Sequence, residues 1–331
     1  MDPIDFVITW VDGGDPAWRE EKARCLNLPE EGDGRDVRFR DWGTLKYLLR
    51  SVEAFAPWVN RVHLVTWGHL PPWLDEACPK LNIVRHRDFI PPEYLPTFSS
   101  RAIALNLHRI PGLADQFVFF NDDMFLLRPL PPERFFKGGL PADFAVLYPF
   151  TMKRPGDVFA ATVANNMTLI NAHFKKRRLI RYHPAKYLNL RYGRALRYTL
   201  AGLVYPDIVG FWRSHYPQPF LKATYEAVWR AEGAVLDATC RRKLRTPGDV
   251  NEWLMRYWQL AEGSFHPASP GGRHYYAIGE NTPRAEGAIR GQAYDMICLN
   301  DNRAVEDTGP LERLFCDAFE SILPDKSRFE K

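Results

Sequence analysis

Several features are scarce in this sequence of 331 residues, and each absence excludes a class of protein. The five cysteines are widely spaced and form no Cys-x-x-Cys pair, so neither a zinc ribbon nor a disulfide framework is expected. No run of about 18 apolar residues occurs, so no membrane-spanning helix is predicted. The 44 basic and 40 acidic residues leave a net charge of +4, which is too small to indicate a nucleic-acid partner.

The N-terminal stretch also lacks the pattern of a secretion signal. MDPIDFVITWVDGGD has acidic residues where a signal peptide has Lys or Arg, and its apolar run is too short. We therefore expect a cytoplasmic protein. A loose attachment to the inner membrane face through basic residues 173–197 stays open, and the oligomeric state is not predicted.

What the sequence does contain is an alternation of strand-like and helix-like segments. Four short segments rich in β-branched and aromatic residues have the character of strands: residues 4–11, 60–68, 81–90 and 116–123. Two segments between them have apolar residues at helical spacing: residues 41–58 and 99–113. This alternation predicts an α/β fold with a mostly parallel sheet, in which ligands bind beyond the carboxyl ends of the strands.

The composition changes near residue 150. Residues 151–262 read as mainly helical and include a basic, aromatic stretch, whereas residues 263–290 are rich in Gly, Pro and His and are expected to form a loop. A short apolar strand then precedes Asn300-Asp301-Asn302. We therefore divide the chain into residues 1–150, 151–262 and 263–331.

The stretch FVFFNDDMFLL, residues 117–127, places two carboxylates at the end of a buried strand. Adjacent carboxylates are costly to bury unless a positive group meets them. Asp122 and Asp123, together with Asn121, are therefore candidates to hold Mg²⁺ or Mn²⁺, which takes one or two protein carboxylates and completes its sphere with phosphates and water. A turn with a helix cap or an arginine partner is the alternative.

Two further acidic positions follow predicted strands. Asp12 ends the first one, where a doubly wound sheet often holds a base or ribose, but it also fits an Asx turn before two glycines. Asp301 follows the last predicted strand and is a candidate second carboxylate for the same ion. Ordinary turn chemistry is the alternative for Asn300-Asp301-Asn302.

Three residues of the later chain are candidates for chemistry. His215, in SHYPQPF, suits a general base because histidine titrates near neutral pH, although a structural histidine is the alternative and His183 is its main competitor. Arg245, in RTPGD, suits the stabilisation of charge on a transferring phosphoryl group. Asp249 fits either a role in the site or a cap of the following helix.

These motifs, in this order, resemble the Stealth family. The matching stretches are IDFVITWVDGGDP, RFRDWGTLKYLLRSVEAFAPWVNRVHLVT, LPTFSSRAIALNLHRIPGLADQFVFFNDDMFL, SHYPQPF, LRTPGDVNEWLMRYWQLAEG and CLNDN. They cover most of residues 4–302, and residues 4–130 match best. The family includes bacterial capsule and exopolysaccharide phosphotransferases and the catalytic subunit of the animal N-acetylglucosamine-1-phosphotransferase that marks lysosomal enzymes.

The resemblance implies a glycosyltransferase-A-like fold with a helical insertion. Residues 1–150 would form the nucleotide-sugar-binding core, residues 151–262 the insertion and acceptor region, and residues 263–331 a segment that returns to the core. The implied metal ligands are Asp122, Asp123 and Asp301. The implied catalytic residues are His215, Arg245 and Asp12, and the implied donor-binding residues are Asp12, Arg40, Asp41, Arg50, Asn121 and Asp249.

The chain departs from the family pattern at two places. Many members have Asn-Ser where this chain has Ser99-Ser100, and many have Glu where it has Ala104. The loss of a carboxylate at position 104 leaves the acceptor and metal contacts there open, so no role is carried over to that position.

The activity implied by the resemblance is a metal-dependent transfer of a sugar 1-phosphate. The donor would be a UDP-N-acetylhexosamine or UDP-hexose, the acceptor a glycan hydroxyl and the by-product UMP, with Mg²⁺ or Mn²⁺ as the cofactor. One alternative is a glycosyltransferase that attacks the anomeric carbon and releases UDP. Another is a catalytically silent module that binds a sugar nucleotide.

Overall fold

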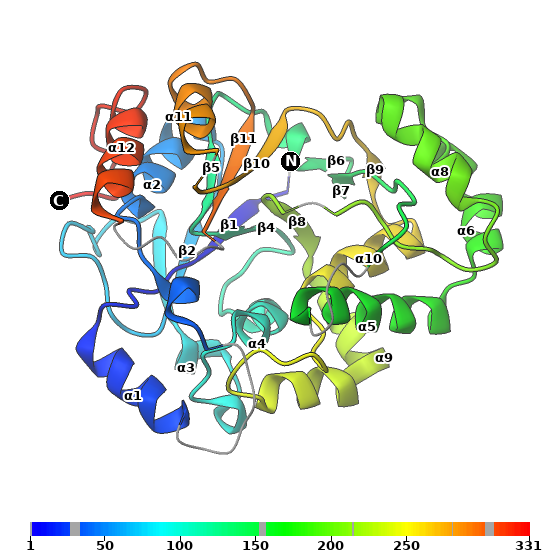
Figure 1. Ribbon diagram of the computed structural model, residues 1–331, viewed down its shortest axis with the longest axis horizontal. Coiled ribbons are helices and arrows are strands. Elements are labelled where there is room, and N and C mark those ends of the chain that lie inside the picture. Colours follow the sequence, from blue (N-terminus) through cyan, green and yellow to red (C-terminus); the bar gives the residue numbers. More distant parts are fainter. Residues whose placement is uncertain (1, 27–33, 152–156, 214, 280, 302–307) are drawn as a thin grey trace.

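The computed structural model describes residues 2–26, 34–151, 157–213, 215–279, 281–301 and 308–331. Its centre is a five-stranded sheet in the order β3-β2-β1-β4-β8 (Figure 1). The strands are β1 (Ile4–Thr9), β2 (Val62–Thr66), β3 (Leu81–Arg85), β4 (Gln116–Asn121) and β8 (Gln218–Leu221). The first four run parallel and β8 runs antiparallel beside β4, which confirms an α/β fold with a mostly parallel sheet.

The central strands are apolar because helices cover both faces of the sheet. Successive residues of β1 alternate between the two faces: Phe6 and Ile8 enter one core, whereas Val7 enters the other. The first core lies against α2 (Leu45–Phe55), α11 (Thr282–Arg290) and α12 (Gly309–Glu320). The second core lies against α4 (Ser100–Leu105), α5 (Val158–His173), α9 (Lys222–Arg241) and α10 (Trp253–Glu262).

Two smaller sheets flank the central one. The first has the order β10-β11-β5 and contains β5 (Met124–Leu126), β10 (Arg273–Ala277) and β11 (Met296–Asn300). The second has the order β6-β7-β9 and contains β6 (Phe136–Lys137), β7 (Leu140–Asp143) and β9 (His266–Pro267). Because β5 follows β4 after a two-residue turn, the first small sheet ties the C-terminal part of the chain to the end of β4.

The remaining helices lie further from the sheet. They are α1 (Pro16–Leu26), α3 (His86–Phe89), α6 (Lys176–Tyr182), α7 (Pro184–Tyr187) and α8 (Leu196–Gly202). Short 3-10 helices occur at Asp36–Phe39, Pro92–Tyr94, Leu107–Arg109, Pro132–Arg134 and Leu190–Ala195. Within the part of the chain that the structure describes, no helix is long and apolar enough to cross a lipid bilayer.

Several local predictions were wrong. The predicted loop at 263–290 contains β9, β10 and α11, and the predicted helix at 99–113 ends at Leu105. The predicted helical region contains β8, which belongs to the central sheet. Asp249 does not cap α10, whose N-cap is Glu252. Residues 28–38 are polar and contain two glycines, which favours a mobile loop, and most of this stretch lies outside the described residues.

Candidate active site

A cavity of about 720 Å³ opens where the parallel strands β1 and β4 end. This is the edge at which the sequence predicted ligand binding. The predicted site residues that line the cavity are Arg40, Asp41, Asn121, Asp122, Asp123, His215, Arg245 and Asp301. The structure therefore brings together residues that lie up to 261 positions apart in the sequence.

The turn between β4 and β5 fixes the two adjacent carboxylates. The backbone carbonyl of Asp123 accepts a hydrogen bond of 2.8 Å from Leu299 N–H of β11. Its side-chain Oδ2 faces Cys298 Sγ at 3.3 Å and accepts a hydrogen bond of 3.1 Å from Asn300. Its Oδ1 is buried and has no hydrogen-bond partner among the described residues.

The electrostatics of this turn favour a cation. Burial raises the pKa of Asp122 well above its ordinary value, and the neighbouring charges of Asp123 and Asp41 raise it further. Burial also opposes ionisation of Asp123, but contacts with His215 and Asn300 outweigh it and lower the pKa of Asp123. Two hard oxygen donors, one of them lacking a partner, fit Mg²⁺ or Mn²⁺.

His215 reaches this turn through the pairing of β8 with β4. The antiparallel register sets Gln218 opposite Phe119, so the chain just before β8 lies beside the turn that follows β4. His215 Nε2 lies 3.7 Å from Asp123 Oδ2. Burial opposes protonation of this imidazole, but Asp123 outweighs it and raises the pKa of His215.

The competing histidine is placed elsewhere. His183 lies against Gly263, the residue that ends α10 with a φ of +81°, and a Cβ there would come within 2.7 Å of the His183 ring. His183 is not among the described residues that line the cavity, whereas His86 is. Burial lowers the pKa of His86 to about 4, so its imidazole is neutral at physiological pH.

Arg245 projects into the cavity from the loop before α10. Its guanidinium donates a hydrogen bond of 2.7 Å to the hydroxyl of Ser100, the first residue of α4. Ser100 belongs to the Ser99-Ser100 pair at which the sequence departs from many family members. The departing residue is Ser99, so the residue that contacts Arg245 is the one of the pair that agrees with the family pattern.

Asp249 does not reach the cavity, because it is fully buried beneath this loop. Its carboxylate pairs with Arg101 at 2.8 Å and with Arg242 at 2.9 Å, and it accepts a hydrogen bond of 2.7 Å from Thr246 N–H. Asp249 is thus buried away from the cavity in which the sequence predicted it to contact a ligand. Asp249 instead holds the loop that carries Arg245.

Asp12 lies at the rim of the site and forms the predicted Asx turn. Its Oδ1 accepts a hydrogen bond of 2.7 Å from Gly14 N–H, while its own N–H donates to His69 Nε2 at 2.7 Å. It is not among the described residues that line the cavity, although its charge contributes to raising the pKa of Asp41. The principal cause of that raised pKa is burial of Asp41.

Arg40 and Asp301 meet inside the cavity. The guanidinium of Arg40 donates to Asp301 Oδ2 at 3.0 Å, and the Asp301 side chain is only 8% exposed. The strand before Asp301 pairs with β5 beside the end of β4, and the Asp301 carboxylate faces an arginine there.

Arg50 is not brought to the site. It is buried in α2, where it binds Glu330 through two hydrogen bonds of 2.8 and 2.9 Å and Glu320 at 3.0 Å. These contacts attach the C-terminal residues to the core, and they hold Arg50 away from the cavity in which the prediction placed it.

The sequence reasoning missed Glu252, which lines the cavity, and Cys298, which lies beside it in contact with Asp123. Glu252 faces His215 and Arg245, and burial raises its pKa. The thiol of Cys298 contacts Asp123, and burial followed by the charge of Asp123 raises its pKa well above its ordinary value. Glu252 lies within the quoted helix motif and Cys298 directly precedes LNDN, so proximity to these motifs was the available signal.

The fold and this cavity define an α/β protein with a charged site at the carboxyl ends of its parallel strands. Two family models match the chain: Stealth protein conserved region 1 over residues 2–28 and conserved region 2 over residues 38–142. The chain is 40% identical to the capsular polysaccharide phosphotransferase WcwK of Streptococcus pneumoniae, with 99% of each chain covered. It is also 40% identical to the receptor polysaccharide phosphotransferase WefC of Streptococcus gordonii, over 100% of this chain and 99% of the relative.

The chain belongs to the Stealth family. A third relative, the exopolysaccharide phosphotransferase cps2G of Lactiplantibacillus plantarum, is 38% identical over 99% of this chain and 96% of its own. Among solved structures, a galactosyltransferase LgtC with donor and acceptor sugar analogues is similar, with 10% identity, a TM-score of 0.42 and 95% of each chain covered.

Proposed function

We propose that this chain transfers a sugar 1-phosphate from a UDP-sugar, either a UDP-N-acetylhexosamine or a UDP-hexose, to a hydroxyl of a glycan. The products are UMP and a phosphodiester. The observation that carries the proposal is the convergence of Asp122 and Asp123 with His215 and Arg245 in one cavity. The relatives, which are named as polysaccharide phosphotransferases, support the reaction class and the kind of acceptor.

Asp122 and Asp123 would hold a divalent cation, Mg²⁺ or Mn²⁺. The bound cation would offset the charge of the donor pyrophosphate, the largest electrostatic demand of phosphoryl transfer. The buried Oδ1 of Asp123 is the atom best suited to bind it. If Asp301 gave up its contact with Arg40 to join these ligands, that guanidinium would be left for a donor phosphate.

His215 is the proposed general base. The acceptor oxygen attacks the β-phosphorus and passes its proton to the imidazole, while the bond from the β-phosphorus to the bridging oxygen breaks and its electrons leave with UMP. Asp123 orients the ring from 3.7 Å, and Glu252 faces it as a second acidic group. Arg245 would stabilise charge on the transferring phosphoryl group.

Two alternatives make different products. A glycosyltransferase would attack the anomeric carbon and release UDP, and a silent module would bind the donor without turnover. The purified protein should therefore be incubated with a panel of UDP-sugars, Mg²⁺ or Mn²⁺ and candidate glycans, and the released nucleotide identified by chromatography. UMP that depends on the glycan supports the proposal, whereas UDP or no nucleotide overturns it.

A further inference from the structure

Exposed apolar side chains are concentrated in one segment. Among the described residues, eight large apolar side chains are exposed, and two of them, Phe159 and Tyr275, line the active-site cavity. The other six all lie between residues 182 and 205: Tyr182, Leu188, Leu190, Leu200, Val204 and Tyr205. Leu190 is 86% exposed and Val204 is 81% exposed, so both project almost fully from the surface.

The same segment carries charge of one sign only. No Asp or Glu occurs between Asp157 and Asp207, whereas residues 175–197 contain nine Lys and Arg. Two of the nine act inside the fold, since Lys176 Nζ donates to backbone carbonyls of residues 202 and 203 and Lys186 Nζ to that of Phe265. The other seven are exposed: Lys175, Arg177, Arg178, Arg181, Arg191, Arg194 and Arg197.

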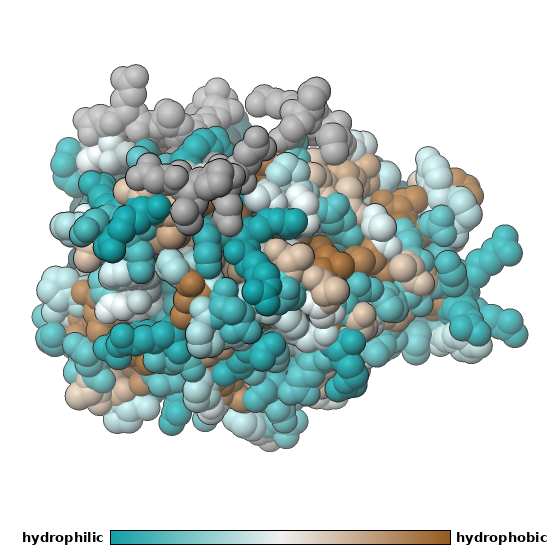
Figure 2. All heavy atoms as spheres, turned by 90° about the horizontal axis from the view of Figure 1, so that it is seen from below, coloured by the Kyte–Doolittle hydropathy of each residue, from teal (hydrophilic) through white to brown (hydrophobic). Residues whose placement is uncertain are grey.

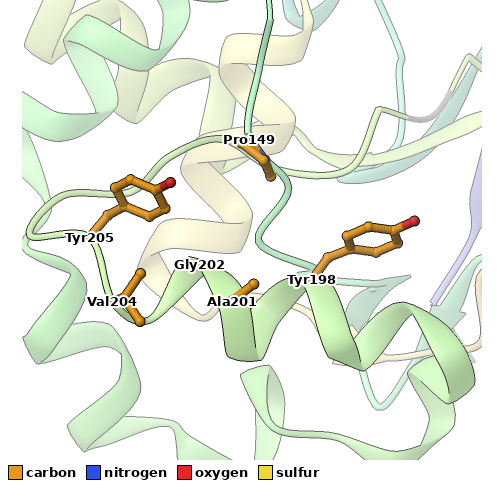
Figure 3. Close-up of a pocket in the computed structure, with 6 residues that line it drawn as sticks. All are labelled: Pro149, Tyr198, Ala201, Gly202, Val204 and Tyr205. Atoms are coloured by element: carbon orange, nitrogen blue, oxygen red, sulfur yellow. The ribbon is translucent and has the colours of Figure 1, made fainter.

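We call residues 175–205, which contain α6, α7 and α8, the basic lobe. It lies at the end of the molecule opposite α12 (Figure 1). Figure 2 shows hydrophilic side chains that project from this end, with hydrophobic side chains gathered beside them. A cavity of about 360 Å³ adjoins α8 and is lined by Pro149, Tyr198, Ala201, Gly202, Val204 and Tyr205, so its walls are mainly apolar (Figure 3).

We propose that the basic lobe docks the protein on the surface of an anionic phospholipid bilayer. Exposed leucine, valine and tyrosine side chains among lysines and arginines are the composition of interfacial segments, whose apolar groups enter the headgroup boundary while the cations meet anionic lipid. A surface that serves solubility alone carries both signs of charge. This inference does not depend on the reaction proposed for the cavity.

Other occupants fit the lobe less well. A second copy of the chain would bring the same seven exposed cations against themselves in a two-fold interface, and no carboxylate of the lobe would offset them. A soluble anionic polysaccharide would pair with the cations but would gain little from aliphatic side chains such as Leu190 and Val204. The bilayer is the partner that uses both features.

The test is sedimentation of the full chain with large unilamellar vesicles. We expect binding to vesicles of phosphatidylglycerol and phosphatidylcholine, little binding to pure phosphatidylcholine, and release as the salt concentration rises. The double variant Arg177→Gln and Arg178→Gln should weaken binding about 30-fold, from the contribution of each cation near an anionic surface. Leu190→Ser with Val204→Ser should weaken it about 10-fold or more through lost apolar insertion.

A matched control distinguishes an effect of the basic lobe on vesicle binding from an effect of the protein's net charge. Arg284→Gln with Arg313→Gln removes the same charge from exposed positions of α11 and α12 and should leave vesicle binding unchanged. Equal loss in this control, or no binding to anionic vesicles at low salt, would overturn the proposal. Normal binding by the Leu190 and Val204 variant would also overturn it, because the lobe would then be a general polyanion site.

A concentration-dependent dimer that these substitutions abolish, without vesicle binding, would assign the lobe to self-association. All four positions substituted in the lobe are exposed, and thermal unfolding would verify that each variant folds.

Discussion

At the scale of single residues, the two oxygens of Asp123 have different surroundings. Oδ2 faces His215, Cys298 and Asn300, whereas Oδ1 is buried and has no hydrogen-bond partner among the described residues. An acceptor atom buried in this way costs free energy unless something fills its place. Oδ2 of Asp123 is therefore placed to position the histidine, and Oδ1 is placed to bind a cation.

The first prediction concerns this cation. Removal of divalent metal with a chelator should abolish turnover, and Asp123→Asn should lower it by at least about 10²-fold, because a bound metal ion supplies several kcal/mol of charge stabilisation. Binding of Mn²⁺, followed by electron paramagnetic resonance, should be lost in the same variant. Asp325→Asn, at an exposed position outside the cavity, is the control and should retain both properties. Full turnover in excess chelator would remove the metal from the mechanism.

The second prediction concerns the proton. His215→Ala should lower turnover by about 10²–10⁴-fold, the usual range for general acid–base catalysis, with little change in donor affinity. A base acts when deprotonated, and the pKa of His215 is raised, so the rate should rise with pH through a value above about 6.5. Asp123→Asn should move the residual limb to lower pH, because the carboxylate stabilises the protonated ring.

His183→Ala is the matched control for this experiment. His183 packs against Gly263 away from the cavity, so its loss should leave the pH limb in place even if stability falls. A His215 variant with near-normal turnover and an unchanged limb would refute the assignment of the base.

At the scale of elements, two antiparallel pairings build the site. The pairing of β8 with β4 brings His215 to the carboxylate turn, and the pairing of β11 with β5 brings Cys298 and Asn300 to it. Neither pairing is visible in local sequence patterns, because each joins strands separated by about 100 residues or more. For this reason the sequence predicted the carboxylates at the strand ends but not their closest neighbours.

The third prediction concerns the ion pair that joins the C-terminal residues to α2. Arg50 of α2 and Glu330 near the C-terminus form a buried pair, with side chains 6% and 5% exposed. Glu330→Gln should lower the free energy of unfolding by about 3–5 kcal/mol, because it leaves the guanidinium charge without its main partner. Arg50→Met combined with Glu330→Leu should restore much of this loss. Urea unfolding followed by circular dichroism would measure both.

This pair also has a defined pH dependence. Burial opposes ionisation of Glu330, but hydrogen bonds from Arg50 outweigh it and lower the pKa of Glu330. The pair therefore contributes its full stability above the unfolded-state pKa of about 4.3 and loses it as the pH falls through the lower folded-state value. The control is Glu53→Gln, which breaks the more exposed pair with Arg328 and should cost less than about 1 kcal/mol. Equal losses for the two variants would contradict the structural role of Arg50.

At the scale of the whole molecule, the parallel core was the most predictable part. Strands at residues 4–9, 62–66, 81–85 and 116–121 are short, apolar and separated by helical patterns, so local physics indicates both their type and their direction. The part beyond residue 150 was less predictable, because β8 pairs with a strand remote in the chain and β10 lies in a stretch rich in Gly, Pro and His that indicates a loop. Arg50 and Asp249 were assigned to the site because they match charged positions of the family, and only tertiary contacts reveal that both act within the fold.

The central claim is that the bond broken lies at the β-phosphorus and not at the anomeric carbon. A UDP-sugar labelled with ³²P at the β-phosphorus distinguishes the two, because the label follows the phosphorus to one product only. Phosphotransfer predicts that the label enters the glycan as a phosphodiester while unlabelled UMP is released, and that both events cease in His215→Ala. Recovery of the label in UDP, with none in the glycan, would contradict the account.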